Sequence, residues 1–186
     1  MRFDVDIAPA SITAVMGAPG ANVASVWTYN GLHWGIQQTI TGASVGLVGG
    51  FGTAVALDQN TLVVGAPTSN LNRGAAVVLV NNGASWTTQG TLSAGVVGVA
   101  GDRFGSAVDV SGDLVIVGAP NALATKGAAY TYARTGVVWG DQQLLSLATG
   151  VVGDHYGDDQ GDDRIQPEET SGYQDHRSAD RHAERC

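Results

Sequence analysis

Short apolar runs separated by Gly, Asn, Asp and Pro recur along the first 157 residues of this chain. In the clearest stretch, residues 53–57 partly alternate, 62–64 are continuously apolar, 75–80 are β-branched and apolar, and 86–92 are more polar. Runs of this kind are typical of β-strands, and the residues between them favour turns. A continuously apolar run predicts a strand buried on both faces. The pattern therefore predicts four short strands in about fifty residues.

Three markers recur in a fixed order and divide the chain into repeats. A Phe-Gly pair is followed fourteen residues after its Phe by Gly-Ala-Pro, and then by a Gly three residues before a Trp. Two copies carry all three markers, one at Phe51, Gly65 and Trp86 and the next at Phe104, Gly118 and Trp139. An earlier copy has Gly17 and Trp34, and counting back fourteen residues from Gly17 gives Phe3; a later copy opens with Tyr156-Gly157. A Gln also follows each Trp (Gln38, Gln89, Gln142). We place the repeats at about residues 3–50, 51–103 and 104–157.

Tandem units of four strands predict an all-β fold made of β-propeller blades, here about three four-stranded antiparallel sheets. Each Gly-Ala-Pro is expected to end an inner strand, because proline has no N–H to donate to a ladder. The recurring Phe and Trp side chains are expected to fill the space between sheets, and a ligand-binding ring of aromatics is the alternative.

Three blades are fewer than the four to eight that usually close a propeller. The resulting open arc is expected to expose apolar side chains such as Ile12, Val15 and Leu144 in its outer blades, and either to self-associate through its open edges or to be only marginally folded. The chain is therefore expected to be a fragment of a longer, closed array.

Charge is concentrated in the last segment of the chain. Residues 1–157 hold 5 basic and 8 acidic side chains, a net of −3, whereas residues 158–186 hold 4 and 9, a net of −5. The total of −8 argues against nucleic-acid binding, which needs a basic face. Ile165 is the only branched aliphatic after Asp158, so the segment 158–186 is predicted to be a disordered tail. Its carboxylates lack EF-hand spacing, and a solvated acidic run is the preferred interpretation.

Other sequence signals exclude several kinds of site. Cys186 is the only cysteine, so no intrachain disulfide can form. No apolar run has the length of a signal peptide's core or of a membrane span, and no membrane span is expected. The histidines show no zinc spacing, the glycines match no nucleotide-binding loop, and no cofactor or metal is expected.

One motif resembles a catalytic site. Gly42-Ala43-Ser44-Val45-Gly46 matches the nucleophile elbow of α/β-hydrolases, which needs a strand before it and a helix after it. The repeat alignment places Ser44 in a linker between repeats, and no helical pattern follows. A propeller enzyme acting on glycans would need convergent carboxylates, and Asp109 and Asp141 are isolated. No catalytic residue is predicted.

The combination of Phe-Gly, Val-Val-Gly-Ala-Pro, the Gly-x-x-Trp turn and Gly101-Asp102-Arg103-Phe104-Gly105 resembles the FG-GAP repeat over about residues 3–157. That family includes the propeller of integrin α-chains and many bacterial surface and secreted proteins. The resemblance implies a seven-bladed propeller in a full-length relative, used for binding or adhesion outside the cell. Integrin-type blades often carry a calcium loop between their first two strands, but 57–61 and 110–114 each hold one carboxylate, and Ca²⁺ wants several oxygens.

The expected function is therefore a non-enzymatic binding, adhesion or scaffold module with a protein or glycan ligand, at the cell surface or outside the cell. The alternatives are part of a propeller enzyme acting on glycans, and a purely structural array without a ligand.

Overall fold

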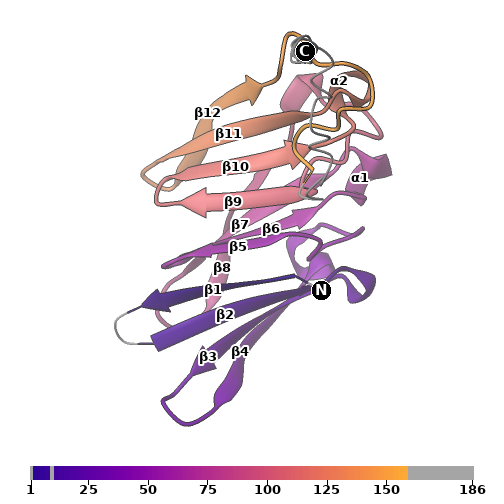
Figure 1. Ribbon diagram of the computed structural model, residues 1–186. Coiled ribbons are helices and arrows are strands. Elements are labelled where there is room, and N and C mark those ends of the chain that lie inside the picture. Colours follow the sequence, from indigo (N-terminus) through magenta and orange to yellow (C-terminus); the bar gives the residue numbers. More distant parts are fainter. Residues whose placement is uncertain (1, 9–10, 159–186) are drawn as a thin grey trace, which may run out of the picture.

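The computed structural model describes residues 2–8 and 11–158, with side chains from residue 12 onward. The predicted tail falls almost entirely outside these residues. Within them, twelve strands form three four-stranded antiparallel sheets, and the strands of each sheet are neighbours in chain order. We call the sheets blades 1, 2 and 3. Figure 1 shows them stacked in that order from β1 to β12.

The strand bounds confirm the predicted all-β repeats, and the three Gly-Ala-Pro triplets lie at the ends of the second strands. Blade 1 holds β1 (Arg2–Ala8), β2 (Ser11–Ala18), β3 (Val23–Tyr29) and β4 (Trp34–Thr41); blade 2 holds β5 (Val55–Asp58), β6 (Thr61–Ala66), β7 (Ala75–Asn81) and β8 (Trp86–Leu92); blade 3 holds β9 (Ala107–Ser111), β10 (Leu114–Ala119), β11 (Ala128–Thr135) and β12 (Val138–Leu145). The short helical turns are η1 (Pro19–Ala21), η2 (Gly42–Val45), α1 (Ser69–Asn72), η3 (Gly95–Val97) and α2 (Ala122–Thr125). In the part of the chain that the structure describes, no helix is long and apolar enough to cross a membrane.

The connections gather at two ends of the stack (Figure 1). At one end, which we call the loop end, lie the turns between second and third strands and the connections from blade to blade, including α1 and α2. At the other, the hairpin end, lie the tight turns that join the last two strands of each blade and the first two strands of blades 2 and 3. The two ends therefore differ in how much irregular chain they present.

Strand β6 is buried at every position because it has a blade on each side. Val63 packs in a cluster with residues of blade 3, whereas Leu62 and Val64 pack in a second cluster with residues of blade 1. Successive side chains of a strand point to opposite faces, so one apolar run supplies both clusters. The prediction of a strand buried on both faces is confirmed.

Pairs of glycines bring neighbouring blades into backbone contact. A Cβ on Gly65 would overlap the carbonyl oxygen of Gly105, and Gly17 faces Gly52 in the same way. Gly52 and Gly105 also have φ near +90°, a region open mainly to glycine. The Gly105 N–H in turn donates to the Gly118 carbonyl at 2.9 Å. The Phe-Gly and Gly-Ala-Pro markers thus meet across each blade junction.

Phe51, Phe104 and Trp86 fill the space between blades, as predicted, whereas Trp34 and Tyr156 are exposed and do not. Phe51 and Phe104 are fully buried, and Trp86 is nearly so. Phe104 lies 5.4 Å from the ring of Tyr130 and 6.2 Å from that of Tyr132, between centroids. This cluster adds two tyrosines that the repeat pattern had not singled out.

Two expectations about blade 1 are wrong. Val15 is fully buried, not exposed, because it faces blade 2, while Ile12 on the same strand faces the other side and is partly covered. Phe3 is also not the equivalent of Phe51. It lies inside β1, where it pairs with Met16 as Val55 pairs with Val64 in blade 2, whereas Phe51 precedes the first strand of its blade. Leu144 is exposed, as expected.

Replacing Gly65 with Ala tests the glycine contact. The added Cβ meets the backbone of Gly105, which cannot move without separating blades 2 and 3. We expect the free energy of unfolding, measured by urea titration, to fall by about 3 kcal/mol. Gly35→Ala is the matched control, because no atom lies within 4 Å of its added Cβ. Equal effects of the two substitutions would contradict the proposed role of the contact.

Alkaline unfolding tests the tyrosine cluster. Burial raises the pKa of Tyr132, with a smaller contribution from Tyr130, and the Tyr132 hydroxyl donates to the Ser93 carbonyl at 2.5 Å. A raised pKa in the folded state means that the stabilisation is complete below pH about 10 and is lost as pH rises further. Tyr132→Phe is expected to cost about 1 kcal/mol at pH 7 and to flatten the loss of stability above pH 10. If the free energy of unfolding of Tyr132→Phe fell with pH above 10 as steeply as that of the unmodified chain, Tyr132 would not be the cause of the alkaline loss of stability.

Candidate functional site

Two left-handed turns shape the loop end. In α1, Asn70, Leu71 and Asn72 have φ between 51° and 61°, and three successive residues of α2 repeat this conformation. Such a backbone costs roughly 1 kcal/mol or more per residue outside glycine. It is compensated by bonds to the next blade: the carbonyls of Asn72 and Arg73 accept the N–H groups that open blade 3, at 2.8 and 3.1 Å. The turn therefore links blades and holds Leu71 outward.

A hollow of about 330 Å³ lies beside α1, between the connections that enter and leave blade 2. Its lining includes Val48, Ser69, Arg73 and Ser93. The Ser69 hydroxyl donates to the Val48 carbonyl at 3.0 Å, which ties the turn to the preceding connection. The hollow thus has fixed walls, offering backbone groups, hydroxyls and one cation.

Exposed aliphatic side chains lie on the same connections and on the turns α1 and α2, and one of them, Val48, lines the hollow. Val96 is fully exposed and Leu71 is 82% exposed. The wider set comprises Val48, Leu71, Val96, Val97, Val99 and Leu123. Since apolar groups in water favour association, this group marks the loop end as a candidate contact surface.

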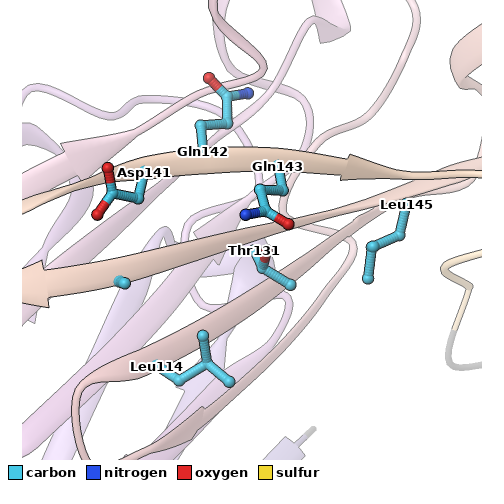
Figure 2. Close-up of a pocket in the computed structure, with 7 residues that line it drawn as sticks. Leu114, Thr131, Asp141, Gln142, Gln143 and Leu145 are labelled. Atoms are coloured by element: carbon cyan, nitrogen blue, oxygen red, sulfur yellow. The ribbon is translucent and has the colours of Figure 1, made fainter.

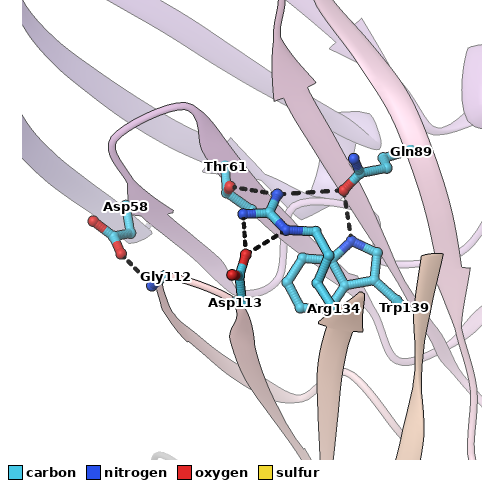
Figure 3. Close-up of polar contacts among 7 residues, drawn as sticks. All are labelled: Asp58, Thr61, Gln89, Gly112, Asp113, Arg134 and Trp139. Atoms are coloured by element: carbon cyan, nitrogen blue, oxygen red, sulfur yellow. Dashed lines mark hydrogen bonds and ion pairs between the residues drawn. The ribbon is translucent and has the colours of Figure 1, made fainter. Parts of the chain in front are cut away.

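At the hairpin end, Arg134 joins two blades through one polar network (Figure 3). Its guanidinium contacts the Asp113 carboxylate at 2.5 and 2.6 Å and the Thr61 hydroxyl at 3.3 Å. It also lies 5.0 Å from the centroid of the Trp139 ring, whose Nε1–H donates to Gln89 Oε1 at 2.7 Å. The network connects blade 3 to blade 2 rather than forming an open site.

The two carboxylates at the positions compared with integrin-type calcium loops both have partners at the hairpin end. Asp58 accepts the Gly112 N–H at 2.5 Å, and Asp113 pairs with Arg134. No cluster of three metal-ligating side chains occurs among the described residues. Each loop thus offers a single carboxylate, which is too few oxygens for Ca²⁺.

The remaining candidates do not come together. Ser44 lies in η2, between blades, and its hydroxyl donates to the Thr41 carbonyl at 2.7 Å. Asp109 lies on β9 and Asp141 on β12, the opposite edges of the blade 3 sheet. Neither arrangement supplies a base beside a nucleophile or a pair of facing carboxylates.

Two of the three glutamines that trail a Trp, Gln38 and Gln89, are links between blades, as is Gln37 beside Gln38. Gln37 accepts the Trp86 Nε1–H at 3.1 Å, while the Gln38 amide binds the Trp86 backbone N–H and carbonyl at 2.8 and 3.0 Å. Gln89 binds Trp139 in the next junction. The sequence carried the signal, a Gln three or four residues after each Trp, but not the partner, which is the Trp of the following blade.

The profile of the FG-GAP repeat family matches residues 34–79 and 86–132, together half of the chain. The chain belongs to the FG-GAP repeat family. Each matched FG-GAP segment begins at the last strand of one blade and runs into the third strand of the next, so it spans a blade junction. No curated protein matches the chain as a whole.

Calcium titration tests the role of the two carboxylates in this FG-GAP chain. We expect calorimetry to detect no micromolar Ca²⁺ site, because each loop offers one carboxylate and that group already has a partner. Arg134→Ala is the informative companion, since it frees Asp113 without adding ligands and should still give no tight site. A micromolar dissociation constant for the unmodified chain would refute this prediction.

Proposed function

We propose that the chain is a non-enzymatic binding module of FG-GAP propeller type and that its loop end is the ligand-facing surface. The ligand is a protein or a glycan, and the module works at the cell surface or outside the cell. The observation that supports this most directly is the group of exposed aliphatic side chains at the loop end, where Val48 lines the 330 Å³ hollow.

The form of the loop end supports a binding role. The connections that carry Val48 and Leu71 are held by hydrogen bonds within and between blades, so their side chains are presented without a large further loss of backbone entropy. Rigid scaffolds that carry variable connections at one end are a common design for recognition. The hairpin end differs, because its Arg134 network is already satisfied between blades.

A matched pair of variants tests the assignment. The triple change Val48→Ser, Leu71→Ser and Val96→Ser alters the loop end, while Leu32→Ser and Val137→Ser alter equally exposed aliphatics at the hairpin end. The chain is first screened against an array of glycans and a panel of purified extracellular-matrix proteins. For any ligand found, the triple variant is expected to bind about tenfold or more weakly, and the hairpin-end control is expected to bind normally.

The outcomes separate the alternatives. Equal weakening by both sets of changes would move the ligand away from the loop end. Cleavage of a glycan on the array, lost on changing Asp109 or Asp141, would overturn the non-enzymatic assignment. An absence of any ligand in both screens would favour a purely structural array.

A further inference from the structure

Two faces of the blade stack have no neighbouring sheet among the described residues. We define the first face as the side of blade 1 turned away from blade 2, with Ala14, Met16, Ser25, Trp27 and Trp34. We define the last face as the side of blade 3 turned away from blade 2, with Leu114, Ile116, Ala129, Thr131, Gln143 and Leu145. We propose that the last face of one chain packs on the first face of a second copy, and that two chains close into a six-bladed ring.

The last face is built like the faces that are covered inside the stack. Ile116 holds the position of Val63 in blade 2, and Leu145 holds that of Leu92, as judged from their strand registers. Val63 and Leu92 are at most 3% exposed, whereas Ile116 is 36% and Leu145 45% exposed. Figure 2 shows Leu114, Thr131 and Leu145 around a shallow hollow of about 680 Å³ on this side. The face therefore has the chemistry of a blade junction without the neighbouring blade.

The first face is the matching half of such a junction. Met16 holds the position of Val64, Trp27 that of Leu79, and Trp34 that of Trp86, which is nearly buried against blade 1. Trp34 is instead 44% exposed. A second chain on this face would cover Trp34 as blade 1 covers Trp86.

Polar groups on the two faces are complementary. Gln143 holds the position of Gln38, whose amide binds the backbone of Trp86 in the next blade. Gln143 lies on the open side with Thr131 (Figure 2) and can bind the Trp34 backbone of the second copy in the same way. Ser25 holds the position that Val77 has in blade 2, and Thr131 holds the position that Val26 has in blade 1. Val26 and Val77 belong to the same buried cluster between blades 1 and 2. The hydroxyls of Ser25 and Thr131 would therefore meet at the new junction.

The chain already carries the opening of the next junction. Gly127 forms an isolated β-bridge with Tyr156, as Gly74 does with Phe104. A Cβ on Gly118 would overlap the Gly157 carbonyl oxygen, as one on Gly65 would overlap that of Gly105. The Tyr156 ring is 39% exposed, whereas Phe104 is fully buried. In the proposed ring this tyrosine is covered by blade 1 of the second copy, and the Gly157 N–H reaches the Gly17 carbonyl, as Gly52 reaches Gly65 at 3.0 Å.

Geometry and number favour a second copy as the occupant. The proposed contact continues the two junctions already formed, and it joins unlike faces, so two identical contacts can close a ring. Two chains of three blades make six, within the four to eight at which propellers close. One group departs from the pattern: Asp109 holds the position of buried Ala56, and its charge weakens the junction.

Sedimentation equilibrium of the purified chain tests the proposal. We expect the mass of two chains. Ile116→Asp on the last face and Met16→Asp on the first face should each weaken association at least 100-fold, while Val137→Asp, in the exposed turn between β11 and β12, should not change it. An equimolar mixture of the Ile116 and Met16 variants retains one unaltered junction and should form a mixed pair. Asp109→Ala should strengthen association about tenfold.

Cross-linking keeps the test decisive if a face variant fails to fold. In a Cys186→Ser background, chains with Gln143→Cys are mixed with chains bearing Trp34→Cys and treated with a short bis-maleimide. A mixed cross-linked pair is expected. A monomeric unmodified chain, a Met16→Asp variant that still pairs with itself, assemblies larger than two, or absence of the mixed cross-link would each overturn the proposal. Loop-end ligand binding by a monomer would leave the proposed function intact.

Discussion

Backbone contact between glycines is the constraint on which the stack depends. At each junction, the Gly of Gly-Ala-Pro lies against the Gly of the following Phe-Gly, with no room for a side chain between them. This approach lets the Phe-Gly N–H bond the inner strand of its own blade while Phe51 or Phe104 fills the space beside it. The spacing of the blades, and with it the density of both apolar clusters, follows from this contact.

The same junctions explain why irregular chain is tolerated at the loop end. Left-handed turns such as Asn70 to Asn72 are costly by themselves, but their carbonyls receive hydrogen bonds from the start of the next blade. A conformation that would be unstable in an isolated hairpin is thus maintained by its neighbour. As a result, side chains such as Leu71 are held in solvent on a fixed backbone, a favourable arrangement for recognition.

At the hairpin end, charge is used for cohesion between blades. Asp58 and Asp113 could each have served as one ligand of a cation, but one accepts a backbone N–H of the next blade and the other pairs with Arg134. Asp113 is mostly exposed, so its ion pair adds modest stability. The more buried links are those from Gln37 and Gln89 to the tryptophan of the following blade, which join outer strands as the glycines join inner ones.

The sequence alone determined the repeat, the number of strands in each blade and three of the core aromatics, Phe51, Phe104 and Trp86, because strand periodicity and turn residues are local properties that recur in each copy. Tertiary structure decided which face each residue occupies. Val15 was expected to be exposed as part of a terminal strand, but register turns it toward blade 2. The Trp86 partner of Gln37 and the Thr61 partner of Arg134 likewise lie in other blades, 49 and 73 residues away. Contacts between repeats depend on packing in space, which no marker within a single repeat records.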